Sequence, residues 1–66
     1  MKLKVDKKND ALYFRLNDSD IVESEEVRPG IIVDFDDKGR AVGVEFLGIK
    51  SRTSEQDLSF LQFQAG

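Results

Sequence analysis

Alternation of apolar and polar residues constrains this chain more than any other feature. Residues 31–47 read IIVDFDDKGRAVGVEFL, with apolar side chains at every second position on both sides of a polar segment. A period of two is typical of strands that bury one face. The segment Asp36-Asp37-Lys38-Gly39 predicts a type I turn followed by a glycine with positive φ. We therefore expect a hairpin with strands over residues 31–36 and 40–47.

The N-terminal part shows the same alternation. Leu3 and Val5 alternate with charged residues in 2–6, and a second apolar series alternates in 11–17. The polar residues 7–10 between these runs predict a turn. The two runs therefore predict another hairpin.

Residues 21–28 are extended in character but polar. Val22 and Val27 lie out of phase, with glutamates between them. Such a shift is typical of a bulge or an edge strand, where charges discourage pairing with another sheet. Pro29 fits an edge because it lacks the N–H that a central strand needs. Gly43, inside the last strand, predicts a bulge or the close approach of another group.

The C-terminal segment predicts a helix over residues 55–64. Ser54 is placed as its N-cap, and acidic residues follow in the first turn. Leu58 and Leu61 would share one face, with Phe60 and Phe63 roughly opposite. A short helix that is apolar on both sides cannot bury both against one sheet. We expect these four residues at a dimer interface; an extended tail is the alternative.

Together these elements predict one small, mainly β domain over residues 1–66. It is a meander-like antiparallel sheet of about five strands, built from hairpins, with a short C-terminal helix. A chain of 66 residues buries only about 60% of its unfolded surface. One short helix covers little of an apolar sheet face, so we expect a homodimer to complete the core. That face is predicted to carry Leu12, Phe14, Leu16, Ile31, Val33, Phe35, Val42, Val44 and Phe46.

Composition argues against several classes of function. The chain has neither cysteine nor histidine, which removes disulfides, thiolate chemistry and the usual general base near neutral pH. Asp34, Asp36, Gly39 and Glu45 match part of a calcium-loop template, but Lys38 places a cation where an oxygen ligand belongs. We predict no enzyme activity, no cofactor and no metal site. The absence of a long apolar run or a signal-peptide core predicts a cytoplasmic protein without a membrane span.

Charge gives the one indication of a partner. Residues 18–37 carry a net charge of −7 in a chain whose total is −3. A surface of this kind attracts basic proteins and repels phosphate backbones. It can equally be a solvated edge that resists aggregation. The candidate partner-binding residues are Glu23, Glu25, Glu26, Asp34, Asp36 and Asp37.

The alternative function is a homodimer that binds a small ligand or nucleic acid through the N-terminal hairpin or the subunit interface. That hairpin gathers basic residues around Tyr13, which could stack on a base. A pI near 4.8 argues against nucleic acid. The basic residues are Lys2, Lys4, Lys7, Lys8 and Arg15.

Three stretches in this order resemble the prokaryotic family known as domain of unknown function 2283. They are DALYFRL at 10–16, VESEEVRPGIIVDFD at 22–36 and GRAVGVEFL at 39–47. The resemblance covers roughly residues 3–50 and implies a compact antiparallel sheet, with no catalytic residues to carry over. It also implies a partner-neutralising, antitoxin-like role, which agrees with the acidic segment. We expect a non-enzymatic interaction module that meets a basic protein.

Overall fold

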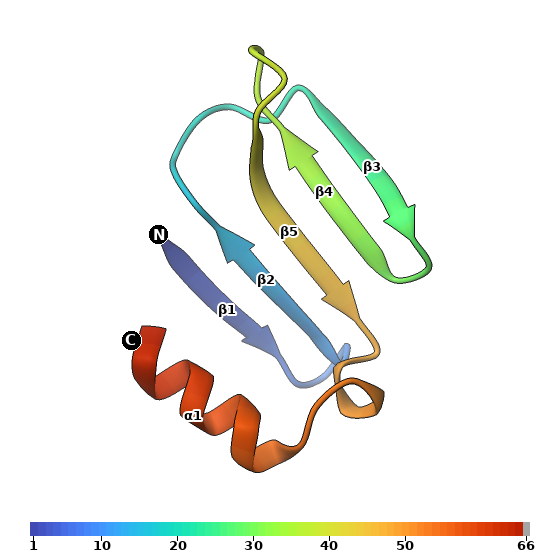
Figure 1. Ribbon diagram of the computed structural model, residues 1–66, viewed down its shortest axis with the longest axis vertical. Coiled ribbons are helices and arrows are strands. Elements are labelled where there is room, and N and C mark those ends of the chain that lie inside the picture. Colours follow the sequence, from blue (N-terminus) through green and yellow to red (C-terminus); the bar gives the residue numbers. More distant parts are fainter. Residues whose placement is uncertain (66) are drawn as a thin grey trace.

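The computed structural model describes residues 1–65 and shows a five-stranded antiparallel sheet followed by a short helix (Figure 1). The predicted five-stranded antiparallel sheet with a short C-terminal helix is therefore confirmed, whereas the strand order is not that of a meander, because β2 pairs with β5. Each observed boundary lies within two residues of the predicted one, and Gly66, the last residue of the predicted domain, lies outside the described residues. The elements are β1 (Lys2–Asp6), β2 (Ala11–Arg15), β3 (Glu23–Arg28), β4 (Ile31–Phe35), β5 (Ala41–Leu47), the 3-10 turn η1 (Ile49–Ser51) and α1 (Glu55–Ala65).

The strands lie in the order β1-β2-β5-β4-β3. Consecutive strands form three hairpins, which pair β1 with β2, β3 with β4, and β4 with β5. The pairing of β2 with β5 joins the N-terminal hairpin to the rest of the sheet. Strand β5 is therefore central, while β1 and β3 form the two edges.

Two local features predicted from the sequence, the turn between β4 and β5 and the bulge in β3, are confirmed. The Gly39 N–H donates to the Asp36 carbonyl at 3.0 Å, and Gly39 has a φ of 77°, as the turn between β4 and β5 requires. Strand β3 shifts register between Glu26 and Arg28, which is the expected bulge at the sheet edge.

The strand register separates two faces of different character. On one face, cross-strand rows place apolar side chains side by side from β1 to β4. Adjacent positions point the other way and form a polar face that carries Tyr13, Asp34 and Glu45. We call the first surface the apolar face; its residues are Leu3, Val5, Leu12, Phe14, Ile31, Val33, Val44 and Phe46.

The core of the chain is small. Among the apolar residues described, four are buried: Ala11, Leu12, Val42 and Ile49. Ile49 is held by η1, where its N–H donates to the Asp10 carbonyl at 3.1 Å. Most of the apolar face is only half-buried, so the sheet does not enclose its own apolar side chains.

Helix α1 begins after Ser54, whose hydroxyl accepts the Asp57 N–H at 3.0 Å, so the predicted N-cap is confirmed. The helix packs against β1 and lies beside the sheet rather than in front of it (Figure 1). Leu58 and Leu61 are half-buried, whereas Phe60 and Phe63 are 64% and 80% exposed. The predicted separation of these two pairs on the helix is confirmed.

Gly43 permits the close approach that its position in the strand predicts. A Cβ atom there would lie 2.5 Å from the Tyr13 hydroxyl oxygen and 3.0 Å from Asp34 Oδ2. The Tyr13 hydroxyl donates to Asp34 at 2.7 Å, across the space that Gly43 leaves free. A side chain at position 43 would therefore displace the tyrosine.

This contact generates a prediction for stability. Gly43→Ala should lower the free energy of unfolding by about 1–3 kcal/mol, because the new methyl group overpacks against the hydroxyl. In a Tyr13→Phe background, which lacks that oxygen, the loss should shrink by about 1 kcal/mol. Urea unfolding of the four chains measures the coupling, and additive losses would contradict the proposed clash.

Candidate functional site

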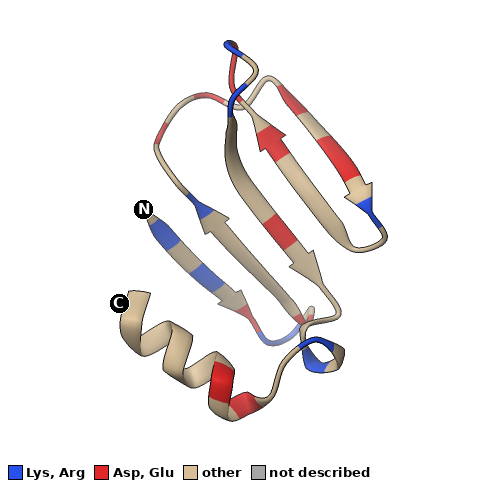
Figure 2. Cartoon of the chain, viewed as in Figure 1, with Lys and Arg blue, Asp and Glu red and all other residues tan. Residues whose placement is uncertain are grey.

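The two edges of the sheet carry opposite charge. Figure 2 shows basic residues along β1 and acidic residues along β3 at the far edge. All six residues of β3 are exposed. The sequence prediction that residues 21–28 form an edge strand is therefore confirmed, and the candidate acidic surface begins on this edge.

The six acidic residues chosen from the sequence do not form one continuous surface. Glu23 and Glu25 pair in register with Phe35 and Val33, so they border the apolar face. Glu26 belongs to the opposite face, and its carboxylate accepts the Gly30 N–H at 3.0 Å. Of the three glutamates, Glu23 and Glu25 take part in no ion pair or side-chain hydrogen bond among the described residues.

Asp34 lies on the polar face and is held within the sheet. Its two oxygens accept hydrogen bonds from the Tyr13 hydroxyl at 2.7 Å and the Ser24 hydroxyl at 2.6 Å. Burial raises the pKa of Tyr13, and the hydrogen bond to Asp34 raises it further. Tyr13 therefore stays protonated near neutral pH and links β2 to β4. The sequence identified Tyr13 and Asp34 as candidates but not the contact between them.

Asp36 is 2% exposed and organises the turn after β4. One oxygen accepts the N–H groups of Lys38 and Arg40 at 3.0 and 2.9 Å, and the other pairs with Arg40 Nε at 2.8 Å. These hydrogen bonds, first that from the Arg40 backbone, hold the pKa of Asp36 below its usual range. Asp37 is exposed in the same turn. Asp36 thus has a structural role, and the residues available for an acidic partner surface are Glu23, Glu25, Glu26 and Asp37.

The basic hairpin is also engaged within the chain. Lys2 lies 3.8 Å from Asp18. Arg15 donates to the Asn17 carbonyl at 2.6 Å and to the Ser19 carbonyl. The Tyr13 ring lies on the same face as both residues, with its hydroxyl bound to Asp34. These contacts order the connection that leaves β2.

A shallow hollow of about 260 Å³ lies on the polar face between Lys4, Tyr13, Asp34 and Glu45. Within residues 1–65, no group of three or more acidic side chains is close enough to hold a metal ion. The same described part of the chain contains no helix long and apolar enough to cross a membrane.

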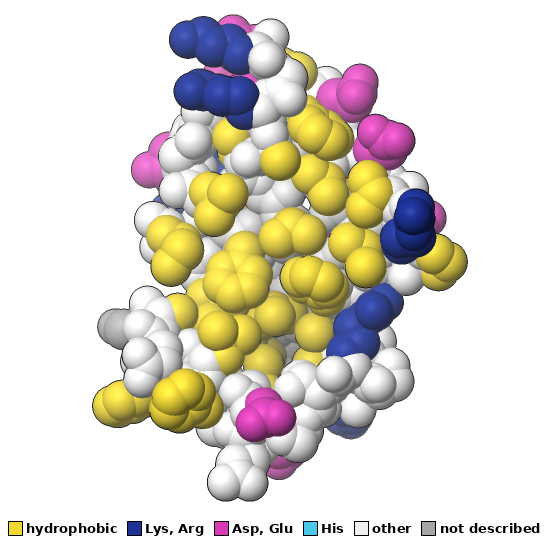
Figure 3. Space-filling model, in the orientation of Figure 1, with side chains coloured by type: hydrophobic (Ala, Val, Ile, Leu, Met, Phe, Trp, Pro, Cys, Tyr) yellow, Lys and Arg dark blue, Asp and Glu magenta, His cyan; other side chains and the backbone are white. Residues whose placement is uncertain are grey.

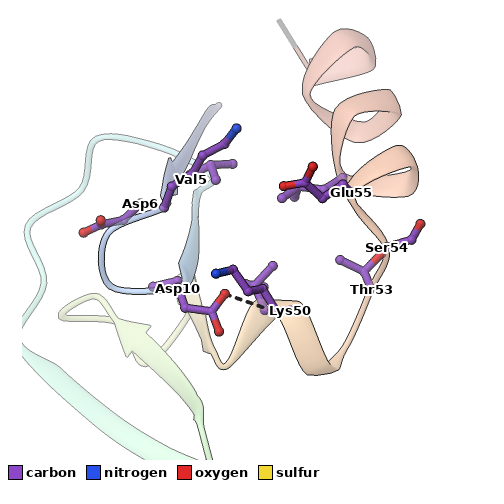
Figure 4. A pocket seen from close by; sticks show the side chains of 11 residues that line it. Val5, Asp6, Asp10, Lys50, Thr53, Ser54 and Glu55 are labelled. Atoms are coloured by element: carbon purple, nitrogen blue, oxygen red, sulfur yellow. Dashed lines mark hydrogen bonds between the residues drawn. The ribbon is translucent and has the colours of Figure 1, made fainter.

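A second hollow, of about 160 Å³, lies where the first turn meets the start of α1 (Figure 4). Asp10 has a φ of 53°, and its Oδ1 accepts the Lys50 N–H at 3.0 Å. Together with the bond from Ile49, this contact ties the β1–β2 turn to η1. Asp10 therefore anchors η1, the segment that leads into α1, a role that no local sequence signal indicates.

The apolar face is only half-buried over most of its residues. Figure 3 looks onto it and shows apolar side chains across the middle of the sheet, with charged groups at its margin. A groove of about 410 Å³ runs between the sheet and the helix, lined by Phe14 and Phe46 on one side and Leu58 and Leu61 on the other. The helix borders the face along β1, and Ile31 and Val33 on β4 are only half-buried.

These features define a class of small, mainly β proteins with a single antiparallel sheet and a helix at one edge. The family model described as protein of unknown function (DUF2283) matches residues 2–50, and the chain belongs to that family. The resemblance inferred from the sequence is thus confirmed. Searches of curated proteins and of solved structures gave no match.

The buried Asp36 predicts how stability depends on pH. Its pKa in the folded chain lies below the ordinary value of 3.8, so the unfolded chain takes up the proton first as pH falls. The contribution of Asp36 to the free energy of unfolding should therefore be fully present well above pH 3.8 and be lost as pH falls through the folded pKa. Asp6, whose pKa is lowered by a hydrogen bond from the Asn9 side chain, adds to the loss in the same range.

Asp36→Asn should flatten this pH dependence, because the amide cannot ionise and cannot pair with Arg40. The measurement is the urea midpoint from pH 3 to pH 7 for the wild type, Asp36→Asn and Asp37→Asn. The exposed Asp37 serves as the matched control. Equal slopes for all three chains would show that Asp36 does not couple to folding.

Proposed function

We propose that this protein is a non-enzymatic interaction module that presents its acidic edge strand to a basic protein. The observation that carries the proposal is β3 itself, a strand at the sheet edge whose six residues are all exposed and on which Glu23 and Glu25 form no ion pair among the described residues. Unpaired charges on an accessible edge are free to attract and orient a partner of opposite charge.

The backbone of β3 supports the same proposal. Its inner side pairs with β4, and it is the last strand of the sheet. An edge strand offers free N–H and C=O groups to an extended segment of another protein. The glutamates favour a segment rich in Lys and Arg over other extended chains. The bulge after Glu26 limits the pairing to the first part of the strand.

The proposed role is antitoxin-like, in which the acidic edge masks a basic, RNA-directed protein. The cytoplasm is the proposed compartment, because such a partner acts there. Charge complementarity would speed the encounter and would make it sensitive to salt.

The test compares two variants that change the net charge equally. Glu23→Gln with Glu25→Gln removes the two free charges of β3, and Asp20→Asn with Glu55→Gln removes two exposed charges elsewhere. Tagged chains retain proteins from a lysate of the source organism, and the bound proteins are identified by mass spectrometry after low-salt and high-salt washes. We expect one basic protein that wild type and control retain at low salt and release at high salt.

With that protein purified, the β3 variant should bind it about threefold to tenfold more weakly than the control. Equal affinity of the two variants would exclude β3 as the binding edge. Retention of no basic protein would overturn the proposed function.

A further inference from the structure

We propose that two copies of this chain stack their apolar faces, so that each sheet supplies the missing layer of the other. This inference does not rest on the proposed function, because stacking uses the faces of the sheets and leaves the outer backbone groups of β3 free for a partner.

The dimensions of the chain show that one copy is incomplete. A compact monomer of 7.5 kDa exposes about 4,250 Å², whereas this chain exposes 4933 Å². A compact domain of this length has a radius of gyration of about 10.8 Å, and the observed value is 12.3 Å. Both differences indicate a flat molecule with an uncovered surface.

The excess area is of the size that a protein interface requires. It amounts to roughly 700 Å², and a standard interface buries about 800 Å² on each partner. The half-buried apolar residues are contiguous, since the row Phe14–Val44–Val33 and the neighbours Phe46 and Ile31 run across adjacent strands. Two such faces can pack about 10 Å apart, as the sheets of a β-sandwich do.

A second copy would cover both exposed apolar surfaces of the chain, which are the outer side of α1 and the β4 side of the sheet. The outer side of α1 exposes Phe60 and Phe63, and the β4 side of the sheet exposes part of Ile31 and Val33. A twofold axis parallel to the strands would place the β1 edge of one copy opposite the β3 edge of its partner. Each α1 would then lie over the open side of the other sheet.

The charges at the margin are compatible with this arrangement. Glu23 and Glu25 border the apolar face on β3, and Arg52 borders it at the end of β5. Arg52 donates to the Leu47 and Pro29 carbonyls at 2.8 and 3.0 Å, which keeps its guanidinium beside the sheet. Charged side chains at the rim of an apolar interface remain in contact with solvent.

Neighbouring residues on β4 provide a matched test. Val33 lies on the apolar face and Ile32 on the polar face, and both are half-buried. Sedimentation equilibrium should give twice 7.5 kDa for the wild type and for Ile32→Lys. Val33→Lys should raise the dimer dissociation constant at least about tenfold, because its ammonium group would enter the apolar interface.

Phe63→Ser tests the helix separately, since a side chain that is 80% exposed contributes little to the fold of one copy. Phe63→Ser should raise the dimer dissociation constant. Val22→Ser, at a 62% exposed apolar position that is not part of the apolar face, should leave it unchanged. Circular dichroism establishes that each variant is folded. A monomeric wild type at millimolar concentration, or a dimer that both Val33→Lys and Phe63→Ser leave intact, would overturn the proposal.

Discussion

The structure depends on one constraint: an apolar sheet face must be covered, and this chain has too little material to cover its own. The five strands and the turns between them occupy residues 2–47, and the α-helix that follows lies beside β1. Burial of apolar area is the main favourable term in folding. A chain with only four buried apolar residues among those described is therefore weakly stabilised as an isolated copy. The proposed pairing of two copies follows from this deficit.

Polar contacts compensate for part of the small core. Asp36 closes the β4–β5 turn, Asp10 ties the first turn to η1, and Asp34 joins Tyr13 to Ser24 across the sheet. Within the described residues, no buried side-chain nitrogen or oxygen lacks a hydrogen-bond partner. Acidic residues thus divide into those that build the sheet and those, on β3, that remain available to a partner.

Local patterns were sufficient to predict the strands, the turns, the bulge in β3 and the cap of α1, because each depends on residues close in sequence. The meander-like order predicted for the strands was wrong, since no turn in the sequence indicates that β2 pairs with β5. The sequence also placed Asp34 and Asp36 with the partner-binding glutamates, because it shows the charge of a side chain but not the hydrogen bonds that occupy it. Asp34 accepts hydrogen bonds from Tyr13 and Ser24, which lie 21 and 10 positions away in the sequence. Asp36 instead closes the turn between β4 and β5. Gly43 was the exception, because a glycine within a strand marks a close approach even when the other group is unknown.

The stacking of two apolar faces is tested most directly by an isotope-filtered NOE experiment on an equimolar mixture of labelled and unlabelled chains. Filtering retains only signals between copies, so it identifies the surface that covers the apolar face. Stacking of the apolar faces predicts NOEs between the Phe60 and Phe63 rings of one copy and the Ile31 and Val33 methyl groups of the other. NOEs between copies that arise from the polar face, at Ile32 or Tyr13, would contradict it. Their complete absence at millimolar concentration would contradict it as well.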